Sequence, residues 1–343
     1  MVLLVDTPRM RDWIASRGVE AILTELVSRM EGSFERWLEF ERSPRVAAHS
    51  EHGVIELMPT SNKERYAFKY VNGHPSNPAR GLQTVAGFGV LADMATGYPL
   101  MLAEMNLLTA LRTAATSAMA AKHLARPHSR TLALIGTGSQ SEFQTLAMKA
   151  VLGITHVRIW DIDADAMNKY ERNAAGFGLE ICRASSAAEA CKGADIVTTC
   201  TADKANAIVL TDDMVAPGMH INAIGGDCPG KTELDTAILY RSRVFVEHEA
   251  QTRIEGEIQL VPADFPVETV WEVVASLKPG RSDMSEVTVF DSVGFAIEDF
   301  TALEYVRDQV MGTRFAGEVD LVTDPSDPKD LFSLISNPVL ATA

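Results

Sequence analysis

The stretch TLALIGTGSQS, residues 131–141, contains the pattern that decides the fold. An apolar run leads directly into Gly136 and Gly138, and helical apolar spacing follows from about Ser139 to Leu152. A strand, a glycine turn and a helix in this order predict the phosphate-binding turn of a dinucleotide-binding fold. The first glycine permits the tight turn, the second lets the backbone approach a pyrophosphate, and Ser141 is small enough for helix–strand packing. The free N–H groups at the start of the helix would receive the phosphates.

An acidic residue ends the next predicted strand, HVRIWD at residues 156–161. This residue, Asp161, follows Gly136 by 25 positions. A carboxylate at this place accepts hydrogen bonds from the ribose hydroxyls of NAD and repels the 2′-phosphate of NADP. The turn, the strand, the helix and the acid together predict NAD as a cofactor. The alternative is a glycine turn in an unrelated α/β protein.

Two kinds of pattern divide the chain. An Ala-rich helix from Leu107 to Ala125 precedes apolar strands that alternate with helices, which predicts a parallel, doubly wound sheet. Before it, a helical pattern at Val19–Phe40 and short β-like runs predict an α+β region. We therefore expect an α/β protein with a Rossmann-type dinucleotide-binding domain over residues 113–312. Residues 1–112 with 313–343 would form an α+β substrate-binding domain. The predicted strands are 131–136, 156–161, 195–200, 220–224, 243–246 and 287–290 in the first of these domains, and 45–49, 53–58, 67–71 and a pair around 95–97 in the second.

Composition excludes several classes of partner. The chain of 343 residues has a net charge of −15 and a pI near 5.0, which argues against nucleic acid, because phosphate binding needs a basic face. No apolar run reaches the roughly 18 residues of a membrane span. The N-terminus meets Asp6 without a basic region, so we expect no signal peptide and a cytoplasmic location. The four cysteines form no CxxC pair and no histidine cluster has zinc-site spacing, so we predict no metal.

A second glycine-containing loop follows a predicted strand in NAIGGDCPGKTEL, residues 222–234. Gly225 and Gly226 allow close contacts that a Cβ forbids, and Asp227 comes directly after them. In an open α/β sheet, ligands bind just past the strand ends, so this loop is a candidate site. The alternative is a surface turn with a solvated aspartate.

Four charged residues lie in apolar or strand-like surroundings: Arg45 in SPRVAAHS, Glu56 in VIELMP, Lys69 in AFKYV and Arg112 in LRTAATSAMAA. An arginine in an Ala-rich helix cannot be buried without an anionic partner. A carboxylate-bearing substrate would provide one, because guanidinium groups bind carboxylates at two points. The alternatives are solvated or salt-bridged cations and, for Glu56, an internal salt bridge to one of them.

Six stretches together resemble the ornithine cyclodeaminase/mu-crystallin family. They are VIELMP, FKYVNGHP, LRTAATSAMAA, IGTGSQSEFQ, NAIGGDCPGKTEL and VTVFDSVGFAIEDF, and the resemblance runs from about Arg45 to Leu331. It implies that Arg45, Lys69 and Arg112 hold the carboxylate of an amino acid and that Val293 touches the substrate. Glu56 and Asp227 would face the distal amine, with Asp227 as proton donor and acceptor. Gly225 and Gly226 would allow a tight approach to the cofactor. The residues that would border NAD are Thr84, Arg112, Ser139, Gln140, Asp161, Thr201 and Ser292, with the backbone of Ile221, Asn222, Ala223 and Ile224.

The resemblance also implies a reaction and an assembly. It is closest to the bacterial ornithine cyclodeaminases, which implies redox-neutral conversion of L-ornithine to L-proline and ammonia, and a homodimer formed through the sheet of the first domain. Lysine cyclodeaminases, amino-acid dehydrogenases and ketimine reductases share the cofactor motif, so they remain alternatives. Glu56 and the Asp227 loop favour cyclodeamination, because a second amine needs carboxylates to receive it. The presence of Asp227, Lys69 and Arg112 argues against a crystallin-like ligand-binding protein without turnover.

Overall fold

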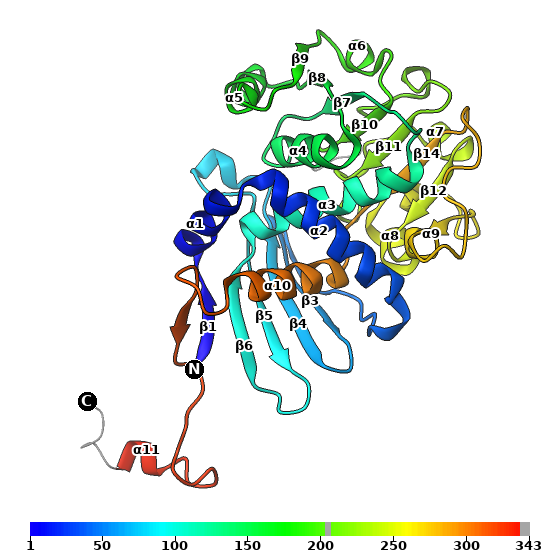
Figure 1. The fold of residues 1–343 in the computed structure, drawn as a ribbon. Helices are drawn as coiled ribbons and strands as arrows, with labels where there is room; N and C mark the ends of the chain where they lie inside the picture. Colours follow the sequence, from blue (N-terminus) through cyan, green and yellow to red (C-terminus); the bar gives the residue numbers. More distant parts are fainter. Residues whose placement is uncertain (203–206, 337–343) are drawn as a thin grey trace.

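The computed structural model describes residues 1–202 and 207–336, and its strands form two separate sheets. Figure 1 shows one sheet in the lower part of the molecule, with β1 and β3–β6 labelled, and the other in the upper part. Helices α2 (Val19–Glu35), α3 (Asn106–Leu124) and α4 (Ser141–Leu152) lie between the two sheets. None of the helices within the described residues is both long and apolar enough to cross a bilayer.

The seven-stranded sheet has the order β15-β1-β6-β5-β4-β3-β2. β1 runs parallel to β6, and the other neighbours are antiparallel. The last strand, β15, therefore joins the first strand at one edge of the sheet. The strands are β1 (Val2–Val5), β2 (Val46–Ser50), β3 (Gly53–Ser61), β4 (Arg65–Gly73), β5 (Val85–Asp93), β6 (Pro99–Glu104) and β15 (Gly317–Val319).

The two faces of this sheet differ in burial. On β3, Glu56 and Met58 are buried, whereas Ile55 and Leu57 are 40% and 41% exposed. This period of two is the pattern of a strand with one covered face. Helix α10 (Ala296–Val310) covers the inner face by packing on β3, β4 and β5, as Figure 1 shows. Glu56 on β3 and Lys69 on β4 therefore lie beneath α10.

The eight-stranded sheet is parallel throughout and has the order β13-β12-β14-β11-β10-β7-β8-β9. From β9 to β11 the strands follow the order 3-2-1-4-5 of a Rossmann sheet, with the switch point between β7 and β10. The predicted fold class, a Rossmann-type domain plus an α+β domain, is confirmed. The strands are β7 (Thr131–Ile135), β8 (His156–Trp160), β9 (Glu180–Arg183), β10 (Ile196–Thr199), β11 (His220–Ala223), β12 (Arg243–Val246), β13 (Glu268–Thr269) and β14 (Thr288–Asp291).

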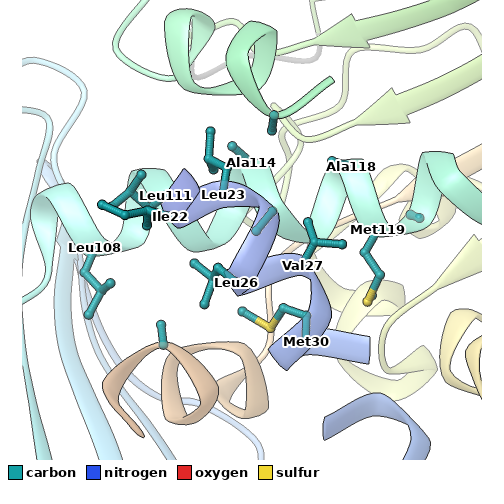
Figure 2. Close-up of a cluster of buried hydrophobic side chains, with 14 of the residues drawn as sticks. Ile22, Leu23, Leu26, Val27, Met30, Leu108, Leu111, Ala114, Ala118 and Met119 are labelled. Carbon is teal, nitrogen blue, oxygen red and sulfur yellow. The ribbon is translucent and has the colours of Figure 1, made fainter. Parts of the chain in front are cut away.

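One hydrophobic core joins the two sheets. The buried residues of α2 and α3 face each other in Figure 2, and the same cluster continues to Val5 in one sheet and to Leu132 and Ile159 in the other. The alanines of α3 allow its neighbours to approach closely, and this brings Arg112 of α3 near both sheets. The labelled members are Ile22, Leu23, Leu26, Val27 and Met30 of α2, with Leu108, Leu111, Ala114, Ala118 and Met119 of α3.

Several sequence-based boundaries differ from the structure. The helix predicted at Val19–Phe40 ends at Glu35 and is followed by a 3-10 turn, η1 (Trp37–Glu39). By contrast, the strand pair predicted around residues 95–97 is confirmed, because β5 and β6 lie on either side of this turn and pair antiparallel. α10 packs on the first sheet, although residues 296–310 were assigned to the dinucleotide-binding domain, so its contacts favour a boundary before Ala296. Residues 337–343 of the predicted C-terminal segment lie outside the described residues.

The remaining elements are short or peripheral. They are α1 (Thr7–Arg17), α5 (Ala164–Ala174), α6 (Ala187–Cys191), α7 (Thr236–Tyr240), α8 (Glu249–Glu255), α9 (Val270–Val274) and α11 (Ser333–Ser336), with the 3-10 turns η2 (Asn77–Arg80), η3 (Asp212–Met214) and η4 (Glu257–Leu260).

Candidate active site

The two glycines of the turn after β7 have different environments. Gly136 has a φ of 99°, and a Cβ there would lie 2.8 Å from the carbonyl oxygen of Cys200. A Cβ on Gly138 would meet nothing within 4 Å. The first position therefore needs glycine because of the neighbouring strand end. The second borders open space at the switch point of the sheet, which fits the close approach of a phosphate.

Asp161 lies beside this turn, directly after β8. Its Oδ2 accepts hydrogen bonds from the backbone N–H of Thr137 at 2.6 Å and from Thr137 Oγ1 at 3.1 Å. Its Oδ1 accepts from the backbone N–H of Asp163 at 2.9 Å. These bonds fix the carboxylate at the edge where a dinucleotide ribose binds in Rossmann folds. Its role toward the ribose stays a prediction.

A charged pair that the sequence did not reveal joins the beginning of α4 to Lys169 of α5. Lys169 Nζ donates to the carbonyl of Gly138 at 2.9 Å and to Glu142 Oε1 at 2.8 Å. Gly138 and Ser139 are exposed, and Gln140 Oε1 is buried without a hydrogen-bond partner in the protein. Because Lys169 offsets the negative charge of Glu142, the N-terminus of α4 is electrostatically able to receive an anion.

Polar side chains also point from the ends of β10 and β11. Thr198 pairs in register with Asn222, and Thr198 Oγ1 and Asn222 Nδ2 are buried without partners in the protein. Asn222 Oδ1 lies 3.1 Å from His220 Nε2. Burial lowers the pKa of His220 to about 3, so the imidazole is neutral. Unsatisfied buried groups of this kind call for a further partner, and a polar ligand at this edge would supply one.

Lys69 and Arg112 are brought together by one acid of α10. Lys69 Nζ donates to Asp299 Oδ1 at 2.9 Å, and Arg112 Nε lies 2.9 Å from the same oxygen. Arg112 Nη1 also donates to Glu298 Oε2 at 2.6 Å. Lys69 is 1% exposed and Arg112 is 6% exposed. The two predicted carboxylate-binding cations therefore belong to one buried ionic network.

Arg45 joins this region to the loop after β14. Its Nη1 lies 3.0 Å from Glu255 Oε2 and 3.5 Å from Glu56 Oε2. Its Nη2 donates to the carbonyls of Val293 and, at 2.6 Å, Gly294. The ion pair that was the alternative for Glu56 is thus present, although it is the longer of the two ion pairs of Arg45.

The acidic partners Glu255, Glu298 and Asp299 were missed by residue-level reasoning. The last two lie in GFAIEDF, where carboxylates interrupt an apolar segment in the same way as Glu56 does in VIELMP. That signal, applied consistently, predicts buried and paired acids. Glu255 has no comparable local signal, because the segment around it is polar.

Burial changes the protonation of this network. It lowers the pKa of Lys69 to about 8, and the charge of Arg112 contributes to the shift. Burial raises the pKa of Glu298, and it raises the pKa of Glu255 to about 7. Arg45 opposes the second of these shifts. The cluster can therefore exchange protons near neutral pH.

Asp227 lies at the outer end of the same region. Its side chain is 56% exposed, and its Oδ1 lies 3.1 Å from Nζ of Lys231, a residue that the sequence reasoning did not select. The charges of Glu56 and Asp227 both contribute to the raised pKa of Glu255, after the larger effects of burial and Arg45. Glu56 and Glu255 share the guanidinium of Arg45, and Asp227 is near enough for its charge to act on Glu255, so this part of the site suits a cationic group.

Gly225 and Gly226 have a different role from the one expected. A Cβ on Gly225 would overlap the carboxylate of Glu233, and a Cβ on Gly226 would lie 2.8 Å from Glu257 Oε1. The expectation that these glycines admit the cofactor is therefore corrected. They make room for two buried carboxylates of the protein itself.

The other predicted residues lie at the strand ends or on the facing sheet. Thr201 N donates to Glu233 Oε1 at 2.8 Å, and Ser292 Oγ donates to Glu247 Oε1. Thr84 directly precedes β5, where its carbonyl accepts from the backbone N–H of His74 at 2.8 Å. The remaining members of the set, Ile221, Ala223 and Val293, are buried, and Ile224 N donates to the carbonyl of Thr199 at 3.1 Å. Within residues 1–202 and 207–336, no three His, Cys, Asp or Glu side chains are grouped as a metal site requires.

Comparison with known proteins decides the family. Residues 10–314 match the ornithine cyclodeaminase/mu-crystallin family. The chain belongs to this family. It is 56% identical over 335 residues to ornithine cyclodeaminase of Brucella suis biovar 1 (strain 1330), with 98% of this chain and 94% of the relative covered.

Solved structures of family relatives share the whole architecture. A lysine cyclodeaminase, described for its recognition of L-lysine, L-ornithine and L-2,4-diaminobutyric acid, is 32% identical with a TM-score of 0.91, covering 97% of this chain and 99% of its own. An archaeal alanine dehydrogenase dimer with bound NAD is 30% identical with a TM-score of 0.86, covering 94% of this chain and 99% of its own. Members with different reactions therefore share this fold.

Proposed function

We propose that this protein is an NAD-dependent ornithine cyclodeaminase, which converts L-ornithine to L-proline and ammonia. The observation that carries the proposal is that Glu56 and Glu255 both lie beside Arg45, with Asp227 near enough for its charge to act on Glu255, next to the carboxyl edge of a dinucleotide-binding sheet. A substrate with a second amine needs such carboxylates, whereas a simple amino-acid dehydrogenase does not. The 56% identity to a Brucella ornithine cyclodeaminase supports the same reaction.

The cofactor site proposed here follows the carboxyl edge of the parallel sheet. The turn from Gly136 to Gln140 would hold the pyrophosphate, and Asp161 would hold the adenosine ribose. Thr201 and Ser292, together with the backbone of 221–224, would border the nicotinamide half. The chemistry that NAD supplies when bound is removal of a hydride from Cα of the amino acid and its return to the ring.

The carboxylate of the substrate would bind at Lys69, Arg112 and Arg45. These cations already have protein partners, so the substrate must compete with Asp299 and Glu298. Burial raises the pKa of Glu298, and a protonated Glu298 would leave the guanidinium of Arg112 available to the substrate. This exchange lets the pocket hold an anion without leaving its cations unpaired in the free protein.

Asp227 would transfer protons at the distal amine. It is the most accessible of the three carboxylates, with 56% of its side chain exposed. As a base it would take a proton from the δ-ammonium group, and the free amine would attack the iminium carbon at Cα. The same carboxylic acid would then return the proton to the departing α-amine, which leaves as ammonia. Glu56 and Glu255 would orient the distal amine through charge.

Product balance tests the proposed reaction. Incubation with L-ornithine and substoichiometric NAD⁺ should yield proline and ammonia one to one over many turnovers, without growth of NADH absorbance. NADH that accumulates in step with ammonia would assign the protein to the amino-acid dehydrogenases instead.

L-lysine is the second substrate to test, because the similar lysine cyclodeaminase recognises both amino acids. We expect ornithine to have the higher kcat/KM, since one methylene is worth about 1–3 kcal/mol of discrimination. A higher kcat/KM for lysine, with a six-membered cyclic product, would change the proposed substrate and keep the proposed reaction class.

We also propose a homodimer formed through the outer face of the first sheet. Ile55, Leu57, Tyr66 and Phe88, which the strand registers place on this face, are between 37% and 41% exposed on β3, β4 and β5. A contiguous apolar face of this kind is typical of an interface, and the archaeal alanine dehydrogenase relative is a dimer. Sedimentation at micromolar concentration should give the mass of two chains, and Leu57→Glu should reduce it to one. A monomeric unmodified protein would remove this proposal.

The division of the chain and its location are proposals as well. The substrate-binding part would comprise residues 1–112 and the C-terminal segment. The chain would re-enter this part before Ala296, because α10 packs on the first sheet. The four free cysteines suit a reducing compartment such as the cytoplasm.

A further inference from the structure

Three buried acids at the carboxyl edge of the parallel sheet form a chain of contacts that the proposed reaction does not use. The first is Asp291, the last residue of β14, which is completely buried. Its Oδ1 accepts a hydrogen bond from the backbone N–H of Glu257, and its Oδ2 accepts from that of Ile258, each at 2.9 Å. One carboxylate therefore holds the first two residues of η4.

Glu257 repeats this arrangement one step further along. Its Oε1 accepts from the backbone N–H of Glu233 at 2.8 Å, and its Oε2 accepts from that of Leu234 at 2.9 Å. Glu257 is 1% exposed. The residue whose own N–H is held by Asp291 thus holds the end of the Asp227 loop.

Glu233 completes the chain at the segment after β10. Its Oε1 accepts from both the backbone N–H of Thr201, at 2.8 Å, and the hydroxyl of Thr201. Its Oε2 has no hydrogen-bond partner in the protein, and the residue is 1% exposed. Asp291, Glu257 and Glu233 therefore connect the ends of β14 and β10 by hydrogen bonds that pass the loop carrying Asp227.

The Asp227 loop rests directly on this chain. The missing side chains of Gly225 and Gly226 make room for the carboxylates of Glu233 and Glu257. A Cβ at either position would force the loop and the carboxylate beneath it apart. The backbone on the N-terminal side of Asp227 is therefore packed on Glu257, which holds the backbone on its C-terminal side, and on Glu233, whose own N–H is held by Glu257.

Stability alone is a poor reason for this arrangement. Burial raises the pKa of Asp291 to about 7, and burial together with the charge of Asp291 raises the pKa of Glu257. Buried carboxylates are costly unless hydrogen bonds compensate them, and apolar residues of similar size are often as stable. What the acids provide is positioning, because each carboxylate holds two hydrogen-bond donors at defined places.

We propose that Asp291, Glu257 and Glu233 are positioning residues that keep Asp227 in register with the cofactor-bordering segment at Thr201. This inference rests on the proposed function, since it assumes that Asp227 transfers protons to a substrate held beside the cofactor. A displacement of 1 Å at a reacting group can cost about 10²-fold in rate. The chain of acids prevents such a displacement without touching the substrate.

Glutamine substitutions distinguish the contribution of Glu257 from that of Glu233. Glu257 uses both oxygens as acceptors, so Glu257→Gln must turn an NH₂ group toward a backbone N–H. Glu233 uses a single oxygen for both of its bonds to Thr201, so Glu233→Gln can keep them. Glu249→Gln is the matched control, because Glu249 is a partly exposed residue of the nearby α8 that pairs with Arg253.

Each variant is characterised by kcat per folded site, by the Kd for NAD⁺ from direct titration, and by hydrogen exchange over residues 224–234. We expect Glu257→Gln to lower kcat at least tenfold and to raise exchange in this segment at least tenfold, with the Kd for NAD⁺ changed less than threefold. Glu233→Gln and Glu249→Gln should stay within threefold in all three measurements. Glu233→Ala should lower kcat at least threefold, which gives a second test if Glu257→Gln does not fold.

A kcat of Glu257→Gln within twofold of the unmodified protein, despite faster exchange, would overturn the proposal. So would equal losses in Glu233→Gln and Glu233→Ala, because the first keeps the bonds to Thr201. Failure of the proposed function appears separately, as absence of proline formation by the unmodified protein. Hydrogen exchange and the titration with NAD⁺ require no turnover, so they test the positioning even in that case.

Discussion

Asp299 is the residue on which the buried cations depend most, and its replacement by asparagine tests the whole network. In the folded protein its Oδ1 lies 2.9 Å from both Lys69 Nζ and Arg112 Nε, and it is 1% exposed. Arg112 keeps Glu298 as a second partner at 2.6 Å. Asp299→Asn keeps the shape of the side chain and removes its charge, so Lys69 loses the acid that Asp299 provides.

The expected cost follows from the burial of the pair. Removal of one partner from a buried ion pair costs about 3–5 kcal/mol, because the other charge is left uncompensated. At roughly 2 °C per kcal/mol for a chain of this size, Tm should fall by roughly 6–10 °C. Lys69→Met in the same protein should restore much of this loss, since the pair then becomes neutral.

The loss of unfolding free energy in Asp299→Asn should also depend on pH. The titration of Lys69 determines whether this loss grows or shrinks as pH rises. Its folded pKa of about 8 lies below the unperturbed value of 10.5, so the unfolded chain binds more protons between these values. The stability contributed by this group therefore increases with pH across that window. Asp299→Asn removes a charge that raises the pKa of Lys69. In the variant, the stability contributed by Lys69 therefore starts to increase at a lower pH. The difference in stability between the two proteins should be largest well below pH 8, should narrow as pH rises toward 8, and should then stay constant, because Lys69 is by then neutral in both folded proteins.

Urea denaturation followed by tryptophan fluorescence measures these quantities in the unmodified protein, the two single variants and the double variant. A coupling energy above about 1 kcal/mol between the two positions is expected for residues in direct contact. Additive effects of Asp299→Asn and Lys69→Met, or a Tm of Asp299→Asn within 2 °C of the unmodified protein, would refute the reasoning.

Three further predictions concern single residues. Asp227→Asn should lower kcat by about 10²–10⁴ through loss of the base, with the Kd for NAD⁺ unchanged; near-normal turnover would make the loop a simple turn. Asp161→Ser should narrow the preference for NAD⁺ over NADP⁺, and equal binding of both by the unmodified protein would contradict the ribose assignment. Competitive inhibition by pentanoate should weaken as pH rises above about 8, because Lys69 then loses its charge, and Lys69→Arg should move this loss to higher pH; a pH-independent inhibition constant would exclude Lys69 as the anion ligand.

The parts of the site that the sequence predicted are those with a local signal. Gly136 and Asp161 belong to one strand–turn–helix–strand unit, in which the period of apolar residues and the position of glycine fix the geometry. The charges of Lys69 and Arg112 in apolar segments indicated a need for anionic partners and left open a substrate carboxylate or an ion pair within the protein; both residues are buried and paired with acids of the protein. The apolar residues beside a charged residue in the sequence therefore indicate that it needs an oppositely charged partner if it is buried.

The identity of the paired acid could not be predicted in this way. Lys69 and Asp299 are 230 residues apart, and only the packing of α10 on the first sheet brings them together. The Asp227 loop gives the sharper example. Its glycines correctly indicated a close approach, but the approaching groups are Glu233 and Glu257 and were expected to be the cofactor. A glycine records that space is needed and carries no information about which atoms fill it.

The buried acids of this protein bind two kinds of partner, and the amino-acid sequence does not show which acid binds which kind. Asp299 and Glu298 bind side-chain cations, so the free energy of each pair depends on protonation and on competition with a substrate carboxylate. Glu257 and Asp291 bind backbone amides, which carry no net charge and cannot be displaced by a substrate. The first kind of contact is therefore exchangeable and the second permanent. A site that must take up an anion while holding its base in place needs both, and the two kinds meet where the loop after β14 follows Asp291.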